Sequence, residues 1–505
     1  MEYNTIYKPK GDAMKHIKID PITRLEGHGK IDIFLDEQGE VANCYFVVPE
    51  LRGFEKFCQG RPVEDLPRIT TRICGVCPEA HHMASAKACD AVYHVTIPPA
   101  ARKLRELLYN TFYCADHTVH FYALGGPDFV VGPDAPKAER NILGVIRKVG
   151  LDAGKKVIKL RALAGEIIET LGGKKIHQVT AIPGGVSKGL TEEERQKFLS
   201  YASYFVEFGQ FTLQVFEDIV LKNSDYVDMI LSDTFAHKTY YMGLVDENNK
   251  VNFYDGMVRV VDPEGNEFCK YHPHEYTEHI SEHIEPWTYL KYPYLKNVGW
   301  KGFVDGKESG VYRATPLARL NVSDGMATPL AQEEYEKFYD TLTGDSSGKT
   351  PVHHTLATHW ARVIELMYAA ERTKELLEDP EITSPDIRVI PTEIPTEGVG
   401  TVEAPRGTLT HHYKTDENGI VREVNLIVGT TNNYAAISMS IKKAAQGLIH
   451  KGVEITDGVL NKIEMAFRAY DPCFACATHT LPGQMPLELR IFDKDGQLIT
   501  SKKRY

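Results

Sequence analysis

The sequence predicts an α+β fold with a long-helix bundle core, peripheral β-hairpins and a small β-containing lobe. Three observations predict this architecture. Apolar residues recur every three to four positions over about 137–171 and 192–222, which predicts long helices. Short alternating runs interrupted by turn-forming residues predict hairpins over 30–48 and 408–428. Between about 230 and 330, turn signals separate short runs rich in Tyr and Val, which predicts the lobe.

The first elements are two strands and a helix. The strands of the first hairpin alternate around the turn Asp36-Glu-Gln-Gly39. Pro98-Pro99 then opens a helix, since proline is favoured in the first turn. The apolar face of this helix consists of Leu104, Leu107, Leu108, Phe112, Ala115 and Val119. Within the next predicted helix, 137–171, four glycines mark either close helix packing or a break: Gly144, Gly150, Gly154 and Gly165.

The later elements follow from the same signals. Thr191 and Glu194 form a capping box that opens the helix over 192–222. Helical periodicity resumes over 354–378 and again over 434–450. Between them, Asp416-Glu-Asn-Gly419 marks the turn of the second hairpin.

Composition excludes several function classes. Hydrophobic content of 42% and charged content of 25% are those of a globular protein. The net charge of −11 argues against nucleic acid or an anionic membrane as the main partner. No apolar run approaches the roughly 20 residues that span a bilayer. The start, Met1-Glu-Tyr-Asn-Thr, lacks the features of a signal peptide. Nine cysteines, four of them in metal-like pairs, fit a reducing compartment, so we expect the cytoplasm.

Two cysteine pairs at opposite ends of the chain are its most informative feature. Cys74 and Cys77 form one C-x-x-C, and Cys473 and Cys476 form the other. A histidine follows each pair closely. The two-residue spacing lets both thiolates of a pair bind one metal centre, so the two pairs supply four soft ligands. A fold that joins them would bury a metal between the two ends of the chain.

Spacing alone leaves the nature of the site open. A C-x-x-C pair is typical of half a structural zinc site or of a thioredoxin-like redox motif. Zinc ribbons place the second pair roughly 15–20 residues after the first, and a redox motif needs only one pair. On this criterion a catalytic or redox metal and structural zinc remain equal alternatives, with unrelated thiols as the third.

The flanking residues resemble the large subunit of nickel–iron hydrogenases. The two cysteine motifs are Arg72-x-Cys-Gly-x-Cys-x-x-x-His81 and Asp471-Pro-Cys-x-x-Cys-x-x-His479. Further matching segments occur in the family's order: Asp20-Pro-Ile-Thr-Arg-Leu-Glu-Gly-His28, Leu51-Arg-Gly-Phe-Glu55, Glu403-Ala-Pro-Arg-Gly407 and Asn432-Asn433. The resemblance thus covers essentially the whole chain, and it also favours the helix-bundle core.

The resemblance implies a specific metal centre. Nickel would be held by all four cysteines, with Cys77 and Cys476 also bridging to an iron that carries carbon monoxide and cyanide. Cys74 and Cys473 would be the terminal nickel ligands. The implied reaction is reversible heterolytic cleavage of dihydrogen. A closed zinc site could not perform it, because zinc has no redox chemistry.

The resemblance assigns a proton acceptor and a histidine near the sulfurs. Glu26 matches the family's proton-relay glutamate and would take a proton from Cys473. The alternative is a surface carboxylate beside Arg24. His81 would donate a hydrogen bond to a bridging cysteine sulfur. A structural histidine is the alternative there, and the neighbouring His82 has no matching role.

An arginine and two aspartates complete the implied catalytic residues. Arg406 matches the arginine whose guanidinium lies over the open coordination position. Asp116 would pair with it and Asp471 would complete the acidic surround, since an unpaired buried guanidinium is costly. Asp116 could instead be an ordinary helix-surface residue. Pro405 and Thr430 correspond to cofactor-binding positions, although this chain has Gly429 where many members have proline, which puts the role of Thr430 in doubt.

A second metal site is also implied. Glu55 matches a ligand for magnesium, or sometimes iron. The backbone carbonyl of Leu426 and the side chain of His479 match the other protein ligands, with waters completing an octahedron. Glu55 could instead pair with Lys56 or Arg52.

The last residues resemble a removable extension. In the family, a maturation endopeptidase cuts directly after the final histidine, after chaperones have helped to load the metals. Residues 1–479 would then form the catalytic domain and 480–505 the extension. Alternating residues over about 487–499 predict a small hairpin within it.

The electrons need a second subunit. The remaining cysteines are too scattered for an iron–sulfur motif: Cys44, Cys58, Cys89, Cys114 and Cys269. No dinucleotide fingerprint is present either. The resemblance therefore implies an iron–sulfur small subunit. The short segments at 51–57, 97–107 and 481–487 look most like the cytoplasmic methyl-viologen-reducing group that feeds a heterodisulfide reductase. NAD-linked and deazaflavin-linked enzymes and a hydrogen sensor are alternatives, whereas quinone-site relatives lack the four cysteines.

Overall fold

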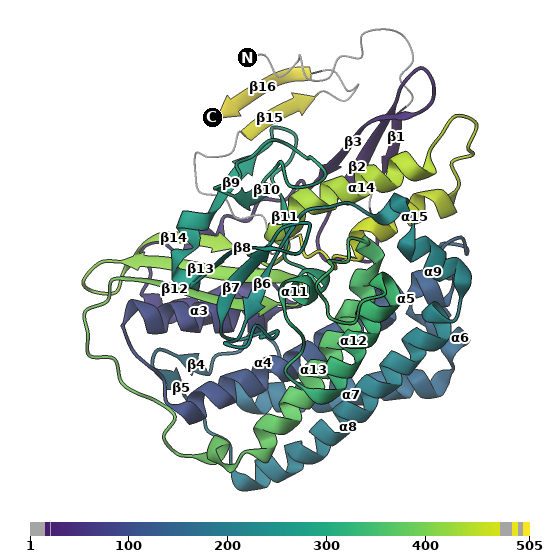
Figure 1. Ribbon diagram of the computed structural model, residues 1–505. Coiled ribbons are helices and arrows are strands. Elements are labelled where there is room, and N and C mark those ends of the chain that lie inside the picture. The colour runs from purple at the N-terminus through teal and green to yellow at the C-terminus, as the bar shows by residue number, and fades with distance from the viewer. Residues whose placement is uncertain (1–15, 21, 475–486, 493–497, 505) are drawn as a thin grey trace.

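The computed structural model describes residues 16–20, 22–474, 487–492 and 498–504 (Figure 1). Four long helices form its core: α4 (Pro99–Val119), α7 (Leu151–Gly172), α8 (Glu192–Phe216) and α13 (Thr358–Glu378). α13 packs against α8 and α4, and α7 packs against the same two helices, so the four close into a bundle. Trp360 and Leu160 are fully buried within it. The predicted helix-bundle core is confirmed.

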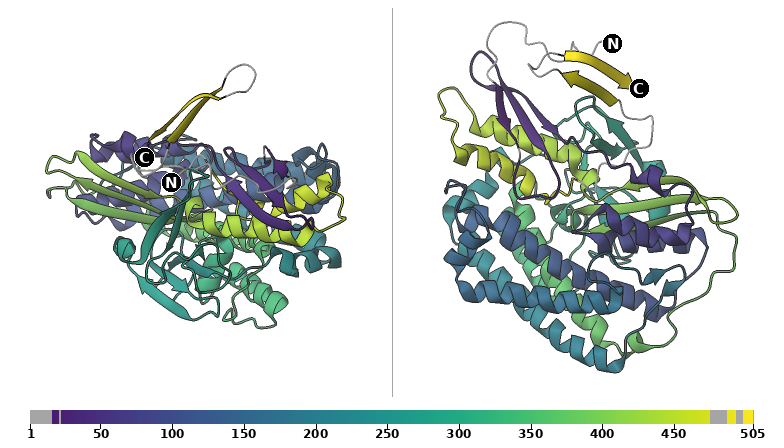
Figure 2. Two further views of the ribbon diagram at one scale, coloured as in Figure 1. Left: turned by 90° about the horizontal axis from the view of Figure 1, so that it is seen from above. Right: turned by 180° about the vertical axis from the view of Figure 1, so that it is seen from behind.

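Two small sheets flank the bundle (Figure 2). β1 (His16–Ile19), β2 (Lys30–Leu35) and β3 (Val41–Val47) form an antiparallel sheet against α14 (Tyr434–Leu448). β12 (Glu397–Ala404), β13 (Gly407–Thr415) and β14 (Val421–Ile427) form the second, which lies on α3 (Pro78–Val92). The close approach requires glycine, because a Cβ at Gly400 would lie 2.1 Å from the carbonyl oxygen of Ala84.

The β-containing lobe is present where the sequence predicts it. Its larger sheet has the order β11-β6-β7-β8, and β9 and β10 form a separate pair. The bounds are β6 (Tyr240–Val245), β7 (Met257–Val261), β8 (Glu267–Tyr271), β9 (Ile280–Ile284), β10 (Lys291–Leu295) and β11 (Tyr312–Arg313). The short helix α11 (Pro316–Val322) packs on β6 and connects the lobe to the bundle.

The remaining elements are short or lie at the periphery. They are α1 (Phe54–Cys58), α2 (Leu66–Ile69), α5 (Gly126–Val130), α6 (Ile142–Val149), α9 (Ser224–Leu231), α10 (Tyr276–His279), α12 (Pro329–Thr343), α15 (Asp457–Arg468), β4 (Ala181–Ile182) and β5 (Gly185–Val186). No helix in the described ranges is long and apolar enough to cross a membrane.

Several predicted boundaries need correction. The helical pattern over 137–171 forms two helices and not one, because the chain breaks at Gly150, whose φ of 93° no helix accommodates; Gly150 is one of the four glycines at which the sequence left a break open. The helix after Thr191 ends as α8 at Phe216 and continues as one π-helical turn to Leu221. Its capping box is confirmed, with the amide of Glu194 donating to Thr191 Oγ1 at 3.1 Å. The predicted hairpin over 408–428 is β13–β14, to which β12 adds a strand that the sequence did not signal.

The C-terminal hairpin is confirmed at the level of the backbone. β15 (Leu487–Phe492) pairs antiparallel with β16 (Leu498–Arg504). The two strands form a sheet of their own (Figure 2).

Candidate metal centre and its surroundings

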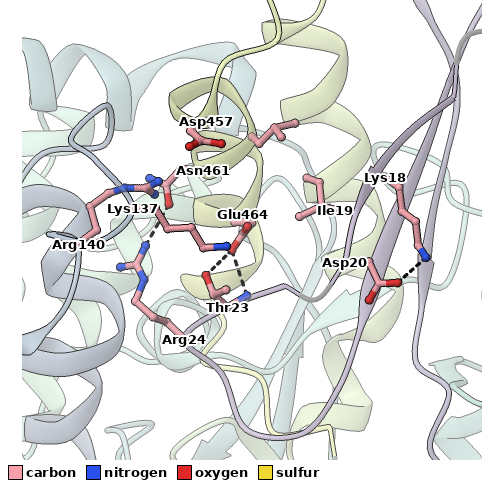
Figure 3. A pocket seen from close by; sticks show the side chains of 11 residues that line it. Lys18, Ile19, Asp20, Thr23, Arg24, Lys137, Arg140, Asp457, Asn461 and Glu464 are labelled. Carbon is pink, nitrogen blue, oxygen red and sulfur yellow. Dashed lines mark hydrogen bonds and ion pairs between the residues drawn. The ribbon is translucent and has the colours of Figure 1, made fainter.

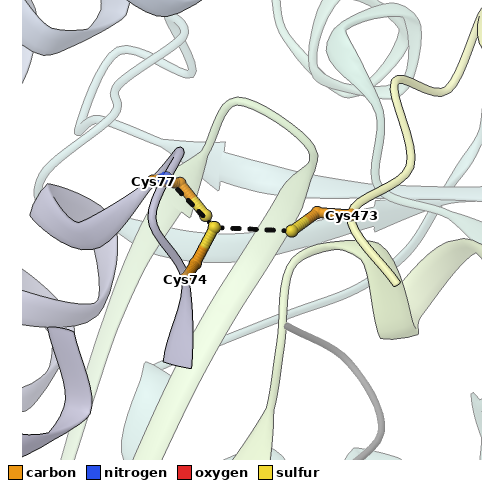
Figure 4. Close-up of side chains that lie close together, drawn as sticks. All are labelled: Cys74, Cys77 and Cys473. Carbon is orange, nitrogen blue, oxygen red and sulfur yellow. Dashed lines mark hydrogen bonds between the residues drawn. The ribbon is translucent and has the colours of Figure 1, made fainter. Parts of the chain in front are cut away.

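Three of the four predicted cysteine ligands meet in the interior (Figure 4). Cys74 follows a short 3₁₀ turn, and Cys77 is the residue that precedes Pro78 at the start of α3. Cys473 arrives from the other end of the chain, with its Sγ 3.5 Å from that of Cys74. The three sulfur atoms lie within 4.8 Å of one another and are buried. Cys476 and His479 lie outside the described residues.

The loop between the first two cysteines favours a thiolate. The amides of Val76 and Cys77 both lie 3.2 Å from Cys74 Sγ and donate to it. Burial raises the pKa of Cys74, but hydrogen bonds from Cys77 and the charge of Arg406 outweigh it and hold the pKa below its ordinary value. Metal binding requires the deprotonated form, so the local structure prepares this ligand.

Glu26 lies directly beside Cys473, as the sequence predicts. Its Oε2 is 2.9 Å from Cys473 Sγ. The backbone fixes this contact, because Glu26 and Cys473 form a parallel β-bridge and the amide of Phe474 donates to the carbonyl of Glu26 at 3.0 Å. The alternative is a surface carboxylate beside Arg24; Glu26 is half-buried, and Arg24 turns to Leu124, Asn461 and Asp128.

The segment before Glu26 is fastened to α15 (Figure 3). The hydroxyl of Thr23 donates to Glu464 at 2.9 Å, and Arg24 donates to Asn461 at 3.0 Å. Arg24 also pairs with Asp128, which Arg468 contacts from the other side at 2.8 Å. These contacts hold the N-terminal and C-terminal segments of the chain together a few residues before Glu26 and Cys473.

Arg406 and two aspartates form the predicted ion cluster. Arg406, only 4% exposed, follows β12 at the turn into β13. Its Nη1 and Nη2 lie 3.2 Å from Asp116 Oδ1, and its Nη2 lies 2.8 Å from Asp471 Oδ2. Burial raises the pKa of Asp116 to about 6 despite the arginine. The pKa of Asp471 lies below its ordinary value, because Arg406 and His120 outweigh its burial.

The turn that carries Arg406 is held by contacts that the sequence did not reveal. Glu403 is fully buried and accepts from Arg319 at 3.0 Å and from the amide of Leu244 at 2.7 Å. Arg319 also donates to the carbonyl of Pro405 at 3.3 Å. Glu403 lies within the segment 403–407 that resembles the family, but the resemblance assigns its carboxylate no role. Only the packing therefore identifies this residue.

Thr430 contacts the cluster through the backbone. Its Oγ1 accepts from the amide of Cys473 at 3.1 Å. Within the described part of the chain, its hydroxyl hydrogen has no acceptor. Glycine fits the close packing at position 429, where a Cβ would lie 3.0 Å from the carbonyl oxygen of Gly407.

Glu55 and Leu426, the predicted ligands of a second metal, are neighbours. Leu426 donates its amide to Glu55 Oε1 at 2.9 Å. Lys291 approaches the same oxygen at 3.8 Å, whereas Glu55 Oε2 is buried and has no hydrogen-bond partner among the residues that the structure describes. Burial raises the pKa of Glu55 to about 7. The alternative pairing with Lys56 or Arg52 is wrong, because both make other contacts.

His81 is buried, but its contact differs from the expected one. Its Nδ1 lies 3.1 Å from His411 Nε2, and its Nε2 has no partner among the described residues. Burial lowers its pKa to about 3, so the ring is neutral. No described contact joins it to a cysteine sulfur. His82 is structural, since it accepts from the amide of Ala181.

Two residues that sequence reasoning missed also face the ion cluster. His120 Nδ1 lies 3.1 Å from Asp471 Oδ1. It follows Asp116 by four positions, so helical periodicity could have placed both on one face. Arg362 is 1% exposed, and its Nε and Nη1 have no partner in the described part of the chain. Burial lowers its pKa to about 10. No motif marks this arginine.

The donor set fits the implied metal centre. Three convergent buried sulfurs, one of them favouring the thiolate, suit a soft transition metal. The half-buried carboxylate of Glu26 at 2.9 Å and the fixed guanidinium of Arg406 add an acceptor and a positive charge beside the sulfurs. A structural zinc site needs neither a proton acceptor nor a positive charge beside its ligands. These surroundings therefore favour a catalytic metal over structural zinc.

Comparisons with known proteins agree with this geometry. The profile described as nickel-dependent hydrogenase matches residues 52–145 and 155–479, and one described as HoxL-like matches 16–51. The chain is 51% identical to an Archaeoglobus profundus protein named as an iron-sulfur subunit of F420-non-reducing hydrogenase, over 97% of this chain and 100% of that protein. It is 39% identical to the NAD-reducing hydrogenase HoxS subunit beta of Cupriavidus necator, over 97% of this chain and 100% of that protein.

A solved structure gives the same result. An NAD⁺-reducing [NiFe]-hydrogenase in the H₂-reduced state superposes with a TM-score of 0.85 and 35% identity. The match covers 93% of this chain and 100% of that one. On these grounds the chain belongs to the nickel-dependent hydrogenase family.

Proposed function

We propose that this chain is the subunit in which a nickel–iron hydrogenase reversibly cleaves dihydrogen, with Cys74, Cys77, Cys473 and Cys476 as metal ligands. The observation that carries this proposal is the contact of 2.9 Å between Glu26 and the sulfur of Cys473 within the buried cluster. A structural metal would have no use for a proton acceptor at that sulfur.

Each residue then has a defined task. A nickel–iron centre, when bound, supplies redox chemistry and an open position at which dihydrogen is polarised. Glu26 takes up and returns the proton at Cys473 Sγ. Arg406 would supply a permanent positive charge beside the bound centre, and Asp116 and Asp471 prevent its guanidinium from rotating away.

We extend the proposal to the diatomic ligands and the second metal. Pro405, Arg406 and Thr430 would surround carbon monoxide and cyanide on the iron, and the free hydroxyl hydrogen of Thr430 supports this. The unpartnered Oε2 of Glu55 supports a magnesium or iron site completed by the carbonyl of Leu426 and by His479. His81 would act on a bridging sulfur through its unpartnered Nε2.

An iron–sulfur subunit would dock where the cysteine loop reaches the surface. Val76 is 41% exposed between two buried cysteines. Leu51 and Phe57 are 47% and 52% exposed, and the guanidinium of Arg52 binds the carbonyl of Arg72 at 3.3 Å, which places them beside the loop. Apolar side chains with cationic neighbours are typical of interfaces.

The relatives support a physiological role. The 51% identical protein is named F420-non-reducing. We propose the same group for this chain, in the cytoplasm, with electrons passed onward to a heterodisulfide reductase-type partner. An NAD-linked enzyme is the second candidate, favoured by the relative at 39% identity and by the superposed structure. We further propose that chaperones load the metals and that an endopeptidase then removes 480–505.

Infrared spectroscopy of the native complex, together with nickel and iron analysis, tests the proposed function. Carbon monoxide and cyanide bands that shift on adding hydrogen are expected. Zinc alone in mature protein, with no such bands, would return the cysteines to a structural role. Reduction of viologen, NAD or deazaflavin then separates the candidate groups.

A further inference from the structure

A cationic apolar surface lies on α6 and α7, away from the cysteine loop. We define it as Ile142, Leu143, Ile146, Leu151 and Ile158 with the surrounding cations. Four of its side chains are strongly exposed, with exposed fractions of 42% for Ile142, 61% for Leu143, 72% for Leu151 and 69% for Ile158. Single exposed apolar residues are ordinary, but a contiguous group indicates an interaction site.

The geometry of the two helices makes this group contiguous. Leu151, Gly154 and Ile158 follow one another on a single face of α7, at positions i, i+3 and i+7. Ile146 of α6 packs over Gly154, where a Cβ would lie 3.3 Å from its Cγ1. Leu143 precedes Ile146 by one helical turn, so it extends the same surface. The apolar residues therefore form one patch across the junction at Gly150.

The charge of this surface is opposite to that of the chain. Six lysines and arginines and one aspartate lie between 142 and 161, in a chain of net charge −11. Arg147, Lys148 and Arg161 are exposed and make no ion pair within the described residues, and the exposed Lys155 pairs with Asp152 of the same helical turn at 3.0 Å. Lys156 and Lys159 point the other way and cover rings of α8, with Lys156 Nζ 3.9 Å from the centroid of Phe211. Unpaired cations are thus left at the rim.

We infer that the cationic apolar surface docks an acidic protein subunit other than the iron–sulfur subunit. An apolar centre with a charged rim is the usual anatomy of such interfaces. A protein partner is favoured over an anionic bilayer because the patch holds no tryptophan, tyrosine or phenylalanine, which membrane-surface helices carry on their apolar face. A second copy of this chain is disfavoured because it would bring two identical cationic rims together.

The surface also lies apart from the proposed iron–sulfur interface. α7 has 22 residues and is therefore about 33 Å long. The patch is at its N-terminal end. Beyond its C-terminal end, His177 contacts the carbonyl of Thr71, beside the cysteine loop. This inference rests on the proposed function only in assuming a multi-subunit enzyme.

The test uses the whole enzyme, isolated from its native host through a tag on this chain. The double variant Leu151→Ser with Ile158→Asp removes the apolar centre without touching the core. The matched control is Ile390→Asp with Ile394→Ser, whose side chains are 72% and 68% exposed in a loop without a cation cluster. We expect the first variant, and not the control, to lose roughly tenfold or more of one subunit. Lys148→Glu with Lys155→Glu should lose the same subunit.

Carbodiimide cross-linking identifies the contact. In the wild-type enzyme, Lys148 or Lys155 should join to Asp or Glu of the subunit that the variant loses. Hydrogen uptake with methyl viologen should stay within about twofold in both variants, because neither touches the cluster, so a defect in that activity reports on the proposed function instead. Full retention of every subunit, equal loss in the control, loss of the iron–sulfur subunit, or cross-links to a second copy would overturn the inference. So would binding of the wild-type enzyme, but not the variant, to anionic phosphatidylserine vesicles.

Discussion

The carboxylate of Glu26 lies 2.9 Å from the sulfur of Cys473, although 447 positions separate the two residues. The contact does not depend on side-chain freedom, because the amide of Phe474 binds the carbonyl of Glu26 and sets the register. The backbone itself therefore fixes a proton acceptor beside the sulfur of Cys473.

Replacing Glu26 with glutamine should abolish proton transfer while the metals remain bound. The amide keeps the shape but cannot accept the proton, so hydrogen oxidation should fall by roughly 10²–10⁴-fold. Hydrogen–deuterium exchange activity and nickel content measure the two effects. Glu37→Gln, in an exposed turn of the same segment, is the control and should retain activity. Equal activity of Glu26→Gln and wild type would exclude the relay role.

Cys74→Ser should prevent nickel binding, because an alcohol does not provide the soft anionic ligand that the thiolate does. Nickel per chain in the purified variant, determined by elemental analysis, should approach zero. Cys114→Ser removes an equally buried thiol that lies in the α4 core and should keep its nickel. Loss of nickel in both variants would point to misfolding instead.

Arg406→Lys should lower activity although the charge is kept. A single ammonium cannot bridge Asp116 and Asp471 as the guanidinium does, so the positive charge loses its fixed position. We expect a loss of roughly 10²–10³-fold in kcat with metal content unchanged. Arg68→Lys, which changes an exposed ion pair with Asp65, serves as the control. A wild-type kcat in Arg406→Lys would show that the fixed position of the positive charge does not matter for catalysis.

Asp128 should give the fold a defined dependence on pH. Burial raises its pKa, but Arg468 and Arg24 outweigh this and hold the pKa below the ordinary value. The folded chain therefore binds this proton less readily than the unfolded chain. The stabilisation is complete above about pH 4 and is lost as the pH falls through the lower folded pKa.

Removing that carboxylate takes an anionic partner from two arginines: Arg468 keeps its ion pair with Glu464, whereas Arg24 keeps only the neutral acceptors Leu124 and Asn461. Asp128→Asn should therefore lower the free energy of unfolding by about 3–5 kcal/mol at pH 7. Urea unfolding at pH 7 and in stepwise acidified buffer measures both effects. Asp134→Asn breaks an exposed pair with Lys462 and should cost about 0–1 kcal/mol. Equal losses in the two variants would contradict the buried role.

The proposed maturation step predicts the mass of the native chain. If the endopeptidase acts after the final motif, intact mass spectrometry of active enzyme should find a chain ending at His479. Protein made without maturation factors should retain 480–505 and lack nickel. Active native enzyme that ends at Tyr505 would refute the cleavage.

Local patterns in the sequence predicted those elements whose signals are themselves local. The capping box at Thr191 and the hairpin turn at Asp416 depend on residues a few positions apart, and both are confirmed. The helical pattern over 137–171 left the break at Gly150 open, because periodicity continues past that residue, while the helical backbone does not. The strand β12 escaped notice because its glycines serve the approach of α3, a contact that no local pattern encodes.

The sequence by itself determined the residue types of the site, since two C-x-x-C pairs and the motifs around Glu26 and Arg406 already name the donors. Only the tertiary structure decided which of them meet. It placed Cys473 beside Cys74 and Glu26, it supplied His120 and Arg362, which no motif marked, and it gave the carboxylate of Glu403 a role that its motif does not assign. The physical reason is that burial makes unpaired charge costly, so the partners of Arg406 and of its turn are selected by packing between distant segments.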